Sequence, residues 1–341
     1  MKTSRRTAGV LPLTLVMLLA AGCGESKSAD ARSGVKTLTI AVIPKGTSHE
    51  YWKSVHAGAV RAAQELSAQG KPVNVIWKGP LREDDREQQV QVVEGFVSQG
   101  VNGIVLAPLD DRALVRPVEE ARSAGVPTVI IDSKLELDSI VSYIATDNVK
   151  GGRLAADRLG EVLGGKGRVL MLRYEEGSAS TTQREQGFMT EMKEKFPGVA
   201  VISSDQYAGP TRETAKRASE NLLSRYGADL QGAFTPNESA TVGMLLALQD
   251  IGKVAKVHLV GFDAGQALVD ALRARQIDGL VVQDPMKMGY LGVKTMAASL
   301  RHEPVERRVD TGAMIITADN MNTPKAAELL APPIDKYLRG K

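Results

Sequence analysis

From residue 37 onward, short apolar runs alternate with longer segments of helical periodicity, and this alternation constrains the fold more than any other feature of the chain. The runs expected to form strands are 38–43, 73–77, 103–107, 126–131, 140–145, 168–172, 200–203, 232–235, 257–262 and 277–283. Helices are expected at 48–68, 84–100, 111–124, 148–163, 181–195, 212–226, 237–251, 268–275 and 285–300. Strands that alternate with helices predict βαβ units and parallel sheets. Because these units exceed one doubly wound sheet, we expect an α/β protein of two lobes, and Asp147 is our candidate for the first crossing between them.

The N-terminus accounts for the net charge of +3. Lys2, Arg5 and Arg6 lie within the first 22 residues, which contain no acid, so the rest of the chain is neutral. This balance offers no electrostatic argument for a nucleic-acid partner.

The same segment predicts export. An apolar stretch at 8–21 follows the basic residues and ends in LLAAGC, which resembles a bacterial lipoprotein signal that is cut before Cys23. We therefore expect a signal peptide at 1–22, a lipid on Cys23, and a small, polar tether at 23–35. An ordinary secretory signal with an incidental cysteine is the alternative. Since Cys23 is the only cysteine, no internal disulfide is expected.

Polar side chains follow several of the expected strands. Asn237 and Asp263 each come after an apolar run in the strand–helix–strand stretch 233–265, and Asp132 and Gln283 also lie at strand ends. This edge of a parallel sheet is where ligands bind. Asn and Asp also cap helices, so capping is the alternative for each residue alone. Recurrence of the pattern along the chain favours a binding site.

Further candidates lie at the starts of helices. Arg184 lies early in the helix that follows a strand and loop, and His49, Tyr51 and Trp52 open the first helix. Neighbours on a helix point about 100° apart, so we expect one aromatic of the pair, Trp52, to face the core. Charged donors, charged acceptors, amides and aromatic faces together are the groups that bind a polyhydroxylated ligand.

Signals for enzymes are incomplete. The sequence GEVLGGKG at 160–167 lacks the final Ser/Thr of a P-loop and closes a helix instead of opening one. No G-x-S-x-G, GxGxxG or HExxH motif is present. We therefore expect no catalytic residue, metal or cofactor, and no enzyme.

Six short stretches carry a family resemblance: VIID (129–132), IATDNVKGG (144–152), REQGF (184–188), AFTPNE (233–238), VGFD (260–263) and VVQDP (281–285). In this order they resemble the periplasmic sugar-binding proteins of the ribose-binding branch, which share the type I periplasmic-binding fold with LacI-like regulators. The resemblance runs from about residue 37 to 317.

The resemblance implies roles for the candidate residues. Asp132, Arg184, Asn237, Asp263 and Gln283 would line a sugar cleft, and Tyr51 and Trp52 match the aromatic pair of the family. The ribose binders carry Arg after the first Asp, where this chain has Ser133, and Asn-Pro where it has His49 and Glu50. These departures argue against ribose itself while leaving a small polar ligand.

The resemblance also implies a domain organisation and a mechanism. Two doubly wound lobes, 36–146 plus 284–310 and 147–283 plus 311–341, would be joined by a three-segment hinge near 146–147, 283–284 and 310–311. A monosaccharide or related polyol would be captured between the lobes and delivered to an ABC-type permease in the inner membrane.

We expect a monomer in the periplasm or at the cell surface, held to the membrane by the lipid on Cys23. A binding protein that presents the sugar to a membrane receptor is the alternative. A LacI-type regulator is disfavoured because an export signal stands where such a protein has a DNA-binding motif.

Overall fold

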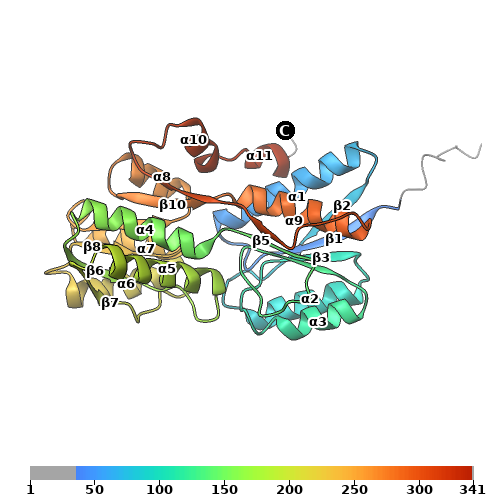
Figure 1. Cartoon of the computed structure of the whole chain (residues 1–341), viewed down its shortest axis with the longest axis horizontal. Coiled ribbons are helices and arrows are strands. Elements are labelled where there is room, and N and C mark those ends of the chain that lie inside the picture. Colours follow the sequence, from blue (N-terminus) through green and yellow to red (C-terminus); the bar gives the residue numbers. More distant parts are fainter. Residues whose placement is uncertain (1–35, 340–341) are drawn as a thin grey trace, which may run out of the picture. The chain divides into compact units, whose positions relative to one another are not determined.

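Two six-stranded sheets organise residues 36–339, which are the residues that the computed structural model describes (Figure 1). The predicted signal peptide and Cys23 lie outside these residues. In spatial order the first sheet contains β11 (Arg308–Asp310), β5 (Ser142–Ala145), β4 (Thr128–Ile131), β3 (Gly103–Leu106), β1 (Leu38–Ile43) and β2 (Val73–Trp77). The second contains β12 (Ala313–Ile316), β10 (Gly279–Gln283), β9 (His258–Phe262), β8 (Gly232–Phe234), β6 (Gly167–Met171) and β7 (Val199–Ser203).

Both sheets have the same doubly wound strand order, and the β10–β12 pair alone is antiparallel among the described strands. In each, the chain starts at an inner strand (β1 or β6), adds one neighbour on one side, and then winds outward on the other. Most strands read as apolar runs because both faces are covered by helices. The predicted fold class, α/β with two parallel-dominated sheets, is confirmed.

Helices cover both faces of each sheet. On the first sheet, α1 (Glu50–Ala68) and α9 (Pro285–Leu300) pack on one face, and α2 (Arg86–Ser98) and α3 (Val115–Ser123) on the other (Figure 1). On the second, α4 (Asn148–Val162) and α5 (Ala179–Lys195) share a face, opposite α6 (Arg212–Tyr226), α7 (Glu238–Asp250), α8 (Gln266–Arg273) and α10 (Pro324–Leu330). We call the first sheet with its four helices the first lobe, and the second sheet with its six the second lobe.

The chain passes between the sheets after β5, after β10 and between β11 and β12. The first and third passages are tied to each other, since the Asp310 carboxylate accepts hydrogen bonds from the backbone N–H of Asp147 (3.1 Å) and of Gly312 (2.8 Å). Two of the three connecting segments are thereby held together at one point.

Four elements were not predicted: β11, β12, α10 and α11 (Ile334–Leu338). Each is short, and the strands are defined by pairing with β5 and β10, which lie far away in sequence. The sequence predicts that the segment 311–341 belongs to the second lobe. In the structure α10 packs on the second sheet, whereas α11 contacts α1 of the first lobe. Within residues 36–339, no helix has both the length and the apolar character that a membrane span requires.

Each lobe contains a helix pair in which a glycine brings the two backbones into contact. A Cβ on Gly58 of α1 would lie 1.9 Å from the carbonyl oxygen of Met286 on α9. A Cβ on Gly152 of α4 would lie 1.9 Å from the carbonyl oxygen of Arg184 on α5. Neither helix can yield without moving off its sheet, so these positions require glycine.

We therefore expect Gly58→Ala and Gly152→Ala each to destabilise the protein by about 1–3 kcal/mol or more, as overpacking does. Gly95→Ala is the matched control. This residue lies within α2, and an added Cβ there would meet only the Gln99 side chain at 3.9 Å. It should gain about 0.5–1 kcal/mol from helix propensity. Urea unfolding followed by circular dichroism measures all three, and equal midpoints for the three variants would contradict the packing argument.

Candidate functional site

One cavity is lined by residues of both lobes at the carboxyl ends of the two sheets, and we call it the cleft cavity. Its cavity volume is about 30 Å³. The structure brings all eight predicted binding residues to it: His49, Tyr51, Trp52, Asp132, Arg184, Asn237, Asp263 and Gln283. It also adds residues that the sequence prediction left out, namely Lys45, Glu83, Tyr174, Ser180, Thr181 and Glu238.

Asp132 and Asp263 occupy equivalent places in the two lobes. Asp132 follows β4 and Asp263 follows β9, the corresponding strand of the second sheet. Both have a positive φ, 63° and 66°, and both are nearly buried. A non-glycine residue in this region costs of order 1–3 kcal/mol, and such residues cluster at functional sites. The second lobe therefore repeats the backbone conformation of the first, and in each lobe a carboxylate lines the cleft cavity.

Glu83 is the centre of a buried hydrogen-bond network. Its Oε1 accepts from Trp52 Nε1 and lies 2.7 Å from His49 Nδ1, and its Oε2 accepts from Tyr174 Oη (2.8 Å). Burial alone would raise the pKa of Glu83, but the hydrogen bond and charge of His49, aided by Lys45, hold that pKa at about 2. His49 and Trp52 belong to the first lobe and Tyr174 to the second, so this carboxylate also links the lobes.

Arg184 is fixed in place by the second lobe. Its Nε donates to Asn148 Oδ1 (2.9 Å) and its Nη1 donates to the carbonyl oxygen of Pro236 (2.9 Å). The guanidinium carbon lies 4.2 Å from the centre of the Phe262 ring, a cation–π contact. A guanidinium has five N–H donors, and these contacts use two of them. Arg184 therefore keeps donors for a ligand while its orientation is already set.

Asp263 and Gln283 form a second fixed pair. Gln283 Nε2 donates to Asp263 Oδ1 (2.7 Å), while Gln283 Oε1 is buried without a partner in the described protein. Burial raises the pKa of Asp263 to about 6, against the charge of Arg184 and the bond from Gln283, which lower it. A buried acceptor without a partner costs about 1–3 kcal/mol. A ligand hydroxyl is the kind of donor that this pair lacks.

Helix capping is the alternative role for Asn237 and Asp263, and the structure shows that only one of them caps a helix. Asn237 does cap α7, because its Oδ1 accepts from the backbone N–H of Ala240 (3.3 Å), although its side chain also lines the cleft cavity. Asp263 caps no helix, since the N-cap of α8 is Gly265. For Asp263 the strand-end placement has no role in helix capping.

The aromatic pair meets edge to face. The ring centres of Tyr51 and Trp52 are 5.0 Å apart with planes at 87°. Trp52 is 3% exposed and packs in the core of the first lobe, as its helical position predicted. Tyr51 donates its hydroxyl to Asp132 Oδ1 (2.8 Å).

Charges in the cleft cavity balance. Its carboxylates are Glu83, Asp132, Glu238 and Asp263; Lys45, Arg184 and Arg212 supply three positive charges, and His49 supplies a fourth when it is protonated. Burial lowers the pKa of His49, but Glu83 outweighs it, so that this pKa is raised. Since an uncompensated buried charge is costly, a balanced cavity favours a neutral polar ligand.

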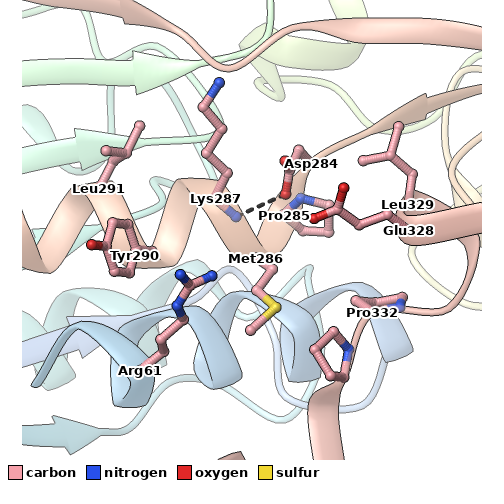
Figure 2. Close-up of a pocket in the computed structure, with 11 residues that line it drawn as sticks. Arg61, Asp284, Pro285, Met286, Lys287, Tyr290, Leu291, Glu328, Leu329 and Pro332 are labelled. Carbon is pink, nitrogen blue, oxygen red and sulfur yellow. Dashed lines mark hydrogen bonds between the residues drawn. The ribbon is translucent and has the colours of Figure 1, made fainter. Parts of the chain in front are cut away.

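A second cavity lies beside α9, α1 and the segment after α10 (Figure 2). Its cavity volume is about 330 Å³, and apolar side chains such as Met286 form much of its wall. Two of its charged groups are already engaged: Arg61 pairs with Glu65 (2.9 Å), and the Asp284 carboxylate accepts from the backbone N–H of Lys287 (2.8 Å). Buried, unpaired polar atoms converge in the cleft cavity instead, so we place the candidate site there.

No group of three or more potential metal-binding side chains occurs within residues 36–339.

The residues of the cleft cavity that were not predicted from sequence share one property. Lys45 and Tyr174 lie in loops after strands, and nothing in their local sequence marks them, whereas Glu83 is one of the polar residues at the start of the second predicted helix. Only their long-range bonds to residues of other segments identify them.

Comparison with solved structures finds the same fold bound to sugars. A carbohydrate transporter solute-binding protein from Agrobacterium radiobacter, solved with D-arabinose, matches with a TM-score of 0.82 and 34% identity, covering 86% of this chain and 99% of the other. An ABC transporter solute-binding protein from Agrobacterium vitis, solved with D-fucose, matches with a TM-score of 0.81 and 33% identity, covering 86% and 100%.

Comparison of sequences agrees. The family described as "periplasmic binding protein domain" matches residues 40–304. The ribose import binding protein of Bacillus subtilis is 28% identical over 302 residues, 88% of this chain and 94% of that protein. The xylitol-binding protein of Mycolicibacterium smegmatis is 24% identical, over 82% of this chain and 78% of that protein.

The Glu83 network yields a prediction about acid stability. A carboxyl with a pKa near 2 when folded and 4.5 when unfolded contributes stability above pH 4.5, which is lost as the pH falls toward 2. The loss is about 3 kcal/mol over this range. Glu83→Gln should therefore have a flatter profile of stability against pH than the wild type below pH 5.

Glu94→Gln, an exposed position on α2, serves as the control and should follow the wild-type profile. Urea midpoints measured from pH 7 down to pH 3 would report the effect. Parallel profiles for Glu83→Gln and the wild type would contradict the assigned role.

Proposed function

This chain belongs to the periplasmic binding protein domain family, and from that premise we propose that it is an extracytoplasmic solute-binding lipoprotein that delivers a small polar ligand to an ABC-type importer. The ligand class that we propose is a neutral monosaccharide or related polyol. The observation that carries this proposal is the convergence of Arg184, Asp263 and Gln283 in a cavity lined by both lobes. Relatives that are named for ribose or xylitol support it, as do similar proteins that were solved with D-arabinose or D-fucose.

The residues divide into donors and acceptors for hydroxyl groups. Arg184 and Asn237 supply N–H donors, while Asp263 and the free oxygen of Gln283 supply acceptors. Each ligand bond to a charged group contributes about 1.5–3 kcal/mol. The edge-to-face pair of Tyr51 and Trp52 covers apolar C–H surface of the ligand. His49 acts through Glu83, and we assign no catalytic role to any of these residues.

Hinge closure is the mechanism that we propose. The lobes would correspond to 36–146 plus 284–310 and 147–283 plus 311–341, with α11 reaching back to the first. Because both lobes line the cavity, only the closed form makes all ligand contacts, and binding shifts an open–closed equilibrium. Closure also buries Asp263, which raises its pKa to about 6, so that the charged carboxylate is less stable in the closed form than in water. Ligand hydroxyls that donate to this carboxylate offset that cost, so the empty cleft opens more readily than the filled one.

The test of the binding site is a thermal-shift and calorimetric screen with D-ribose, D-arabinose, D-fucose, D-allose and xylitol. We expect at least one to bind, and Asp263→Asn to weaken its affinity roughly 10- to 100-fold because a charged acceptor is lost. Asp205→Asn, exposed and outside the cleft cavity, should bind as the wild type does. Equal stabilisation of wild type and Asp263→Asn by every bound ligand would end the assignment.

The lipid anchor on Cys23 is tested by fractionation of cells that express the full chain. Each buried CH₂ of an acyl chain contributes about 0.8 kcal/mol to membrane binding, and more than one chain holds firmly. The wild type should therefore pellet with membranes, and Cys23→Ser should be soluble or retained as an uncut precursor. A wild type that is cleaved and fully soluble would instead favour an ordinary secretory signal.

Sensing is the second candidate function, because a protein that presents sugar to a membrane receptor would have the same cleft. Uptake of the bound sugar by cells that lack this protein separates the two. Lost uptake supports transport, and unchanged uptake with lost sugar response supports sensing.

A further inference from the structure

Asn148 lies where the first passage between the sheets enters the second lobe. It is the first residue of α4, and the preceding residue, Asp147, caps that helix by accepting from the backbone N–H of Lys150 (3.0 Å). Asn148 is 1% exposed and is not among the residues that line the cleft cavity. Burying an amide is costly unless it is hydrogen-bonded, and helix capping does not explain its burial here.

The buried amide is bonded to the side chain of Arg184. Asn148 Oδ1 accepts from Arg184 Nε (2.9 Å), whereas the Pro236 carbonyl accepts from Nη1 and the Phe262 ring covers the face of the guanidinium. Bonds from a charged donor are the stronger kind. Two bonds at different nitrogens fix the direction in which the planar guanidinium points, so loss of the bond at Nε would leave it free to turn.

The same helix also holds the backbone of Arg184. Gly152, one turn after Asn148, allows α4 to approach so closely that a Cβ there would lie 1.9 Å from the Arg184 carbonyl oxygen. In return, Gly187 of α5 allows contact with α4, because a Cβ there would lie 2.1 Å from the Val149 carbonyl oxygen. The first turns of α4 therefore place both the backbone and the side chain of this binding residue.

The residues just before α4 are fixed by the third passage. Arg308, on β11, donates from Nη1 to the carbonyl oxygen of Ala145 (3.0 Å) and from Nη2 to that of Thr146 (3.3 Å). The next residue, Asp147, donates its backbone N–H to Asp310. Asn148 is thus attached to the connecting segments on one side and to Arg184 on the other.

Resting on the proposed function, we propose that Asn148 is a positioning residue that fixes the Arg184 guanidinium relative to the first hinge passage. It acts on the ligand through Arg184. A guanidinium that is already oriented need not be ordered when a sugar binds, whereas a mobile one must be, and ordering a side chain weakens binding. A sugar that bonds to Arg184 is thereby connected to the hinge through one side chain.

The first test is a double-mutant cycle on the affinity for whichever sugar of the panel binds, measured by calorimetry. Asn148→Ala should weaken binding roughly threefold to tenfold. In an Arg184→Met background the same change should cost less than about twofold, because the group through which Asn148 acts is gone. Equal losses in both backgrounds, or no loss in the wild-type background, would overturn the proposal.

Two further variants separate positioning from a general defect in α4. Asn148→Asp keeps a side-chain oxygen that can accept from Arg184 Nε, so it should bind the sugar more tightly than Asn148→Ala. Lys150→Ala changes an exposed residue in the same turn of α4 and should bind as the wild type does. Failure of Asn148→Asp to recover any affinity, or a matching loss in Lys150→Ala, would count against the role of the Nε bond.

A second measurement uses the unliganded protein. Arg184 and Asp263 belong to the same lobe, and the charge of Arg184 lowers the pKa of Asp263, which burial raises to about 6. If Asn148→Ala lets the guanidinium turn away, the pKa of Asp263 should rise above its wild-type value in a carboxyl NMR titration. An unchanged pKa would contradict the positioning role. Should no sugar in the panel bind the wild type, the proposed function fails while this comparison still decides the role of Asn148.

Discussion

Burial of ionised side chains between two lobes is the constraint on which the rest of the structure depends. Arg184 is 2% exposed and Asp263 is 6% exposed, and neither has a partner of opposite charge within ion-pair distance in the described protein. Neutral groups hold each of them: Asn148 and the Pro236 carbonyl hold Arg184, and Gln283 holds Asp263. Charges of this kind are stable in a dry cavity only when their remaining donors and acceptors are satisfied. A hydroxyl-rich solute can supply both at once, which is why this geometry favours such a ligand.

The two lobes have the same fold, so their binding groups lie at equivalent strand ends. Both sheets share a strand order, and the corresponding strands β4 and β9 each end in an aspartate with a positive φ. Each lobe also has a helix pair in glycine-mediated backbone contact, and in the second lobe this contact is with the backbone of Arg184 itself. Packing in the second lobe therefore bears directly on the position of a binding residue.

Much of this arrangement could be predicted from sequence because parallel strands end at a common edge. The alternation of apolar runs and helical patterns specified the long elements, and the polar residues at strand ends specified most of the site. Lys45 and Tyr174 could not be found in this way, since each lies in a loop and is identified only by its contact with a residue distant in sequence, Asp132 or Glu83. The short strands β11 and β12 were missed for the same reason, because only pairing defines them.

The most direct test of the central claim is a crystal structure of the protein with the sugar that binds it in the calorimetric screen. The account predicts the sugar between the lobes, with hydroxyl groups within hydrogen-bond distance of the Arg184 guanidinium, the Asp263 carboxylate and Gln283 Oε1. A sugar bound elsewhere, for example in the cavity beside Arg61 and Tyr290, with the cleft cavity empty, would contradict it.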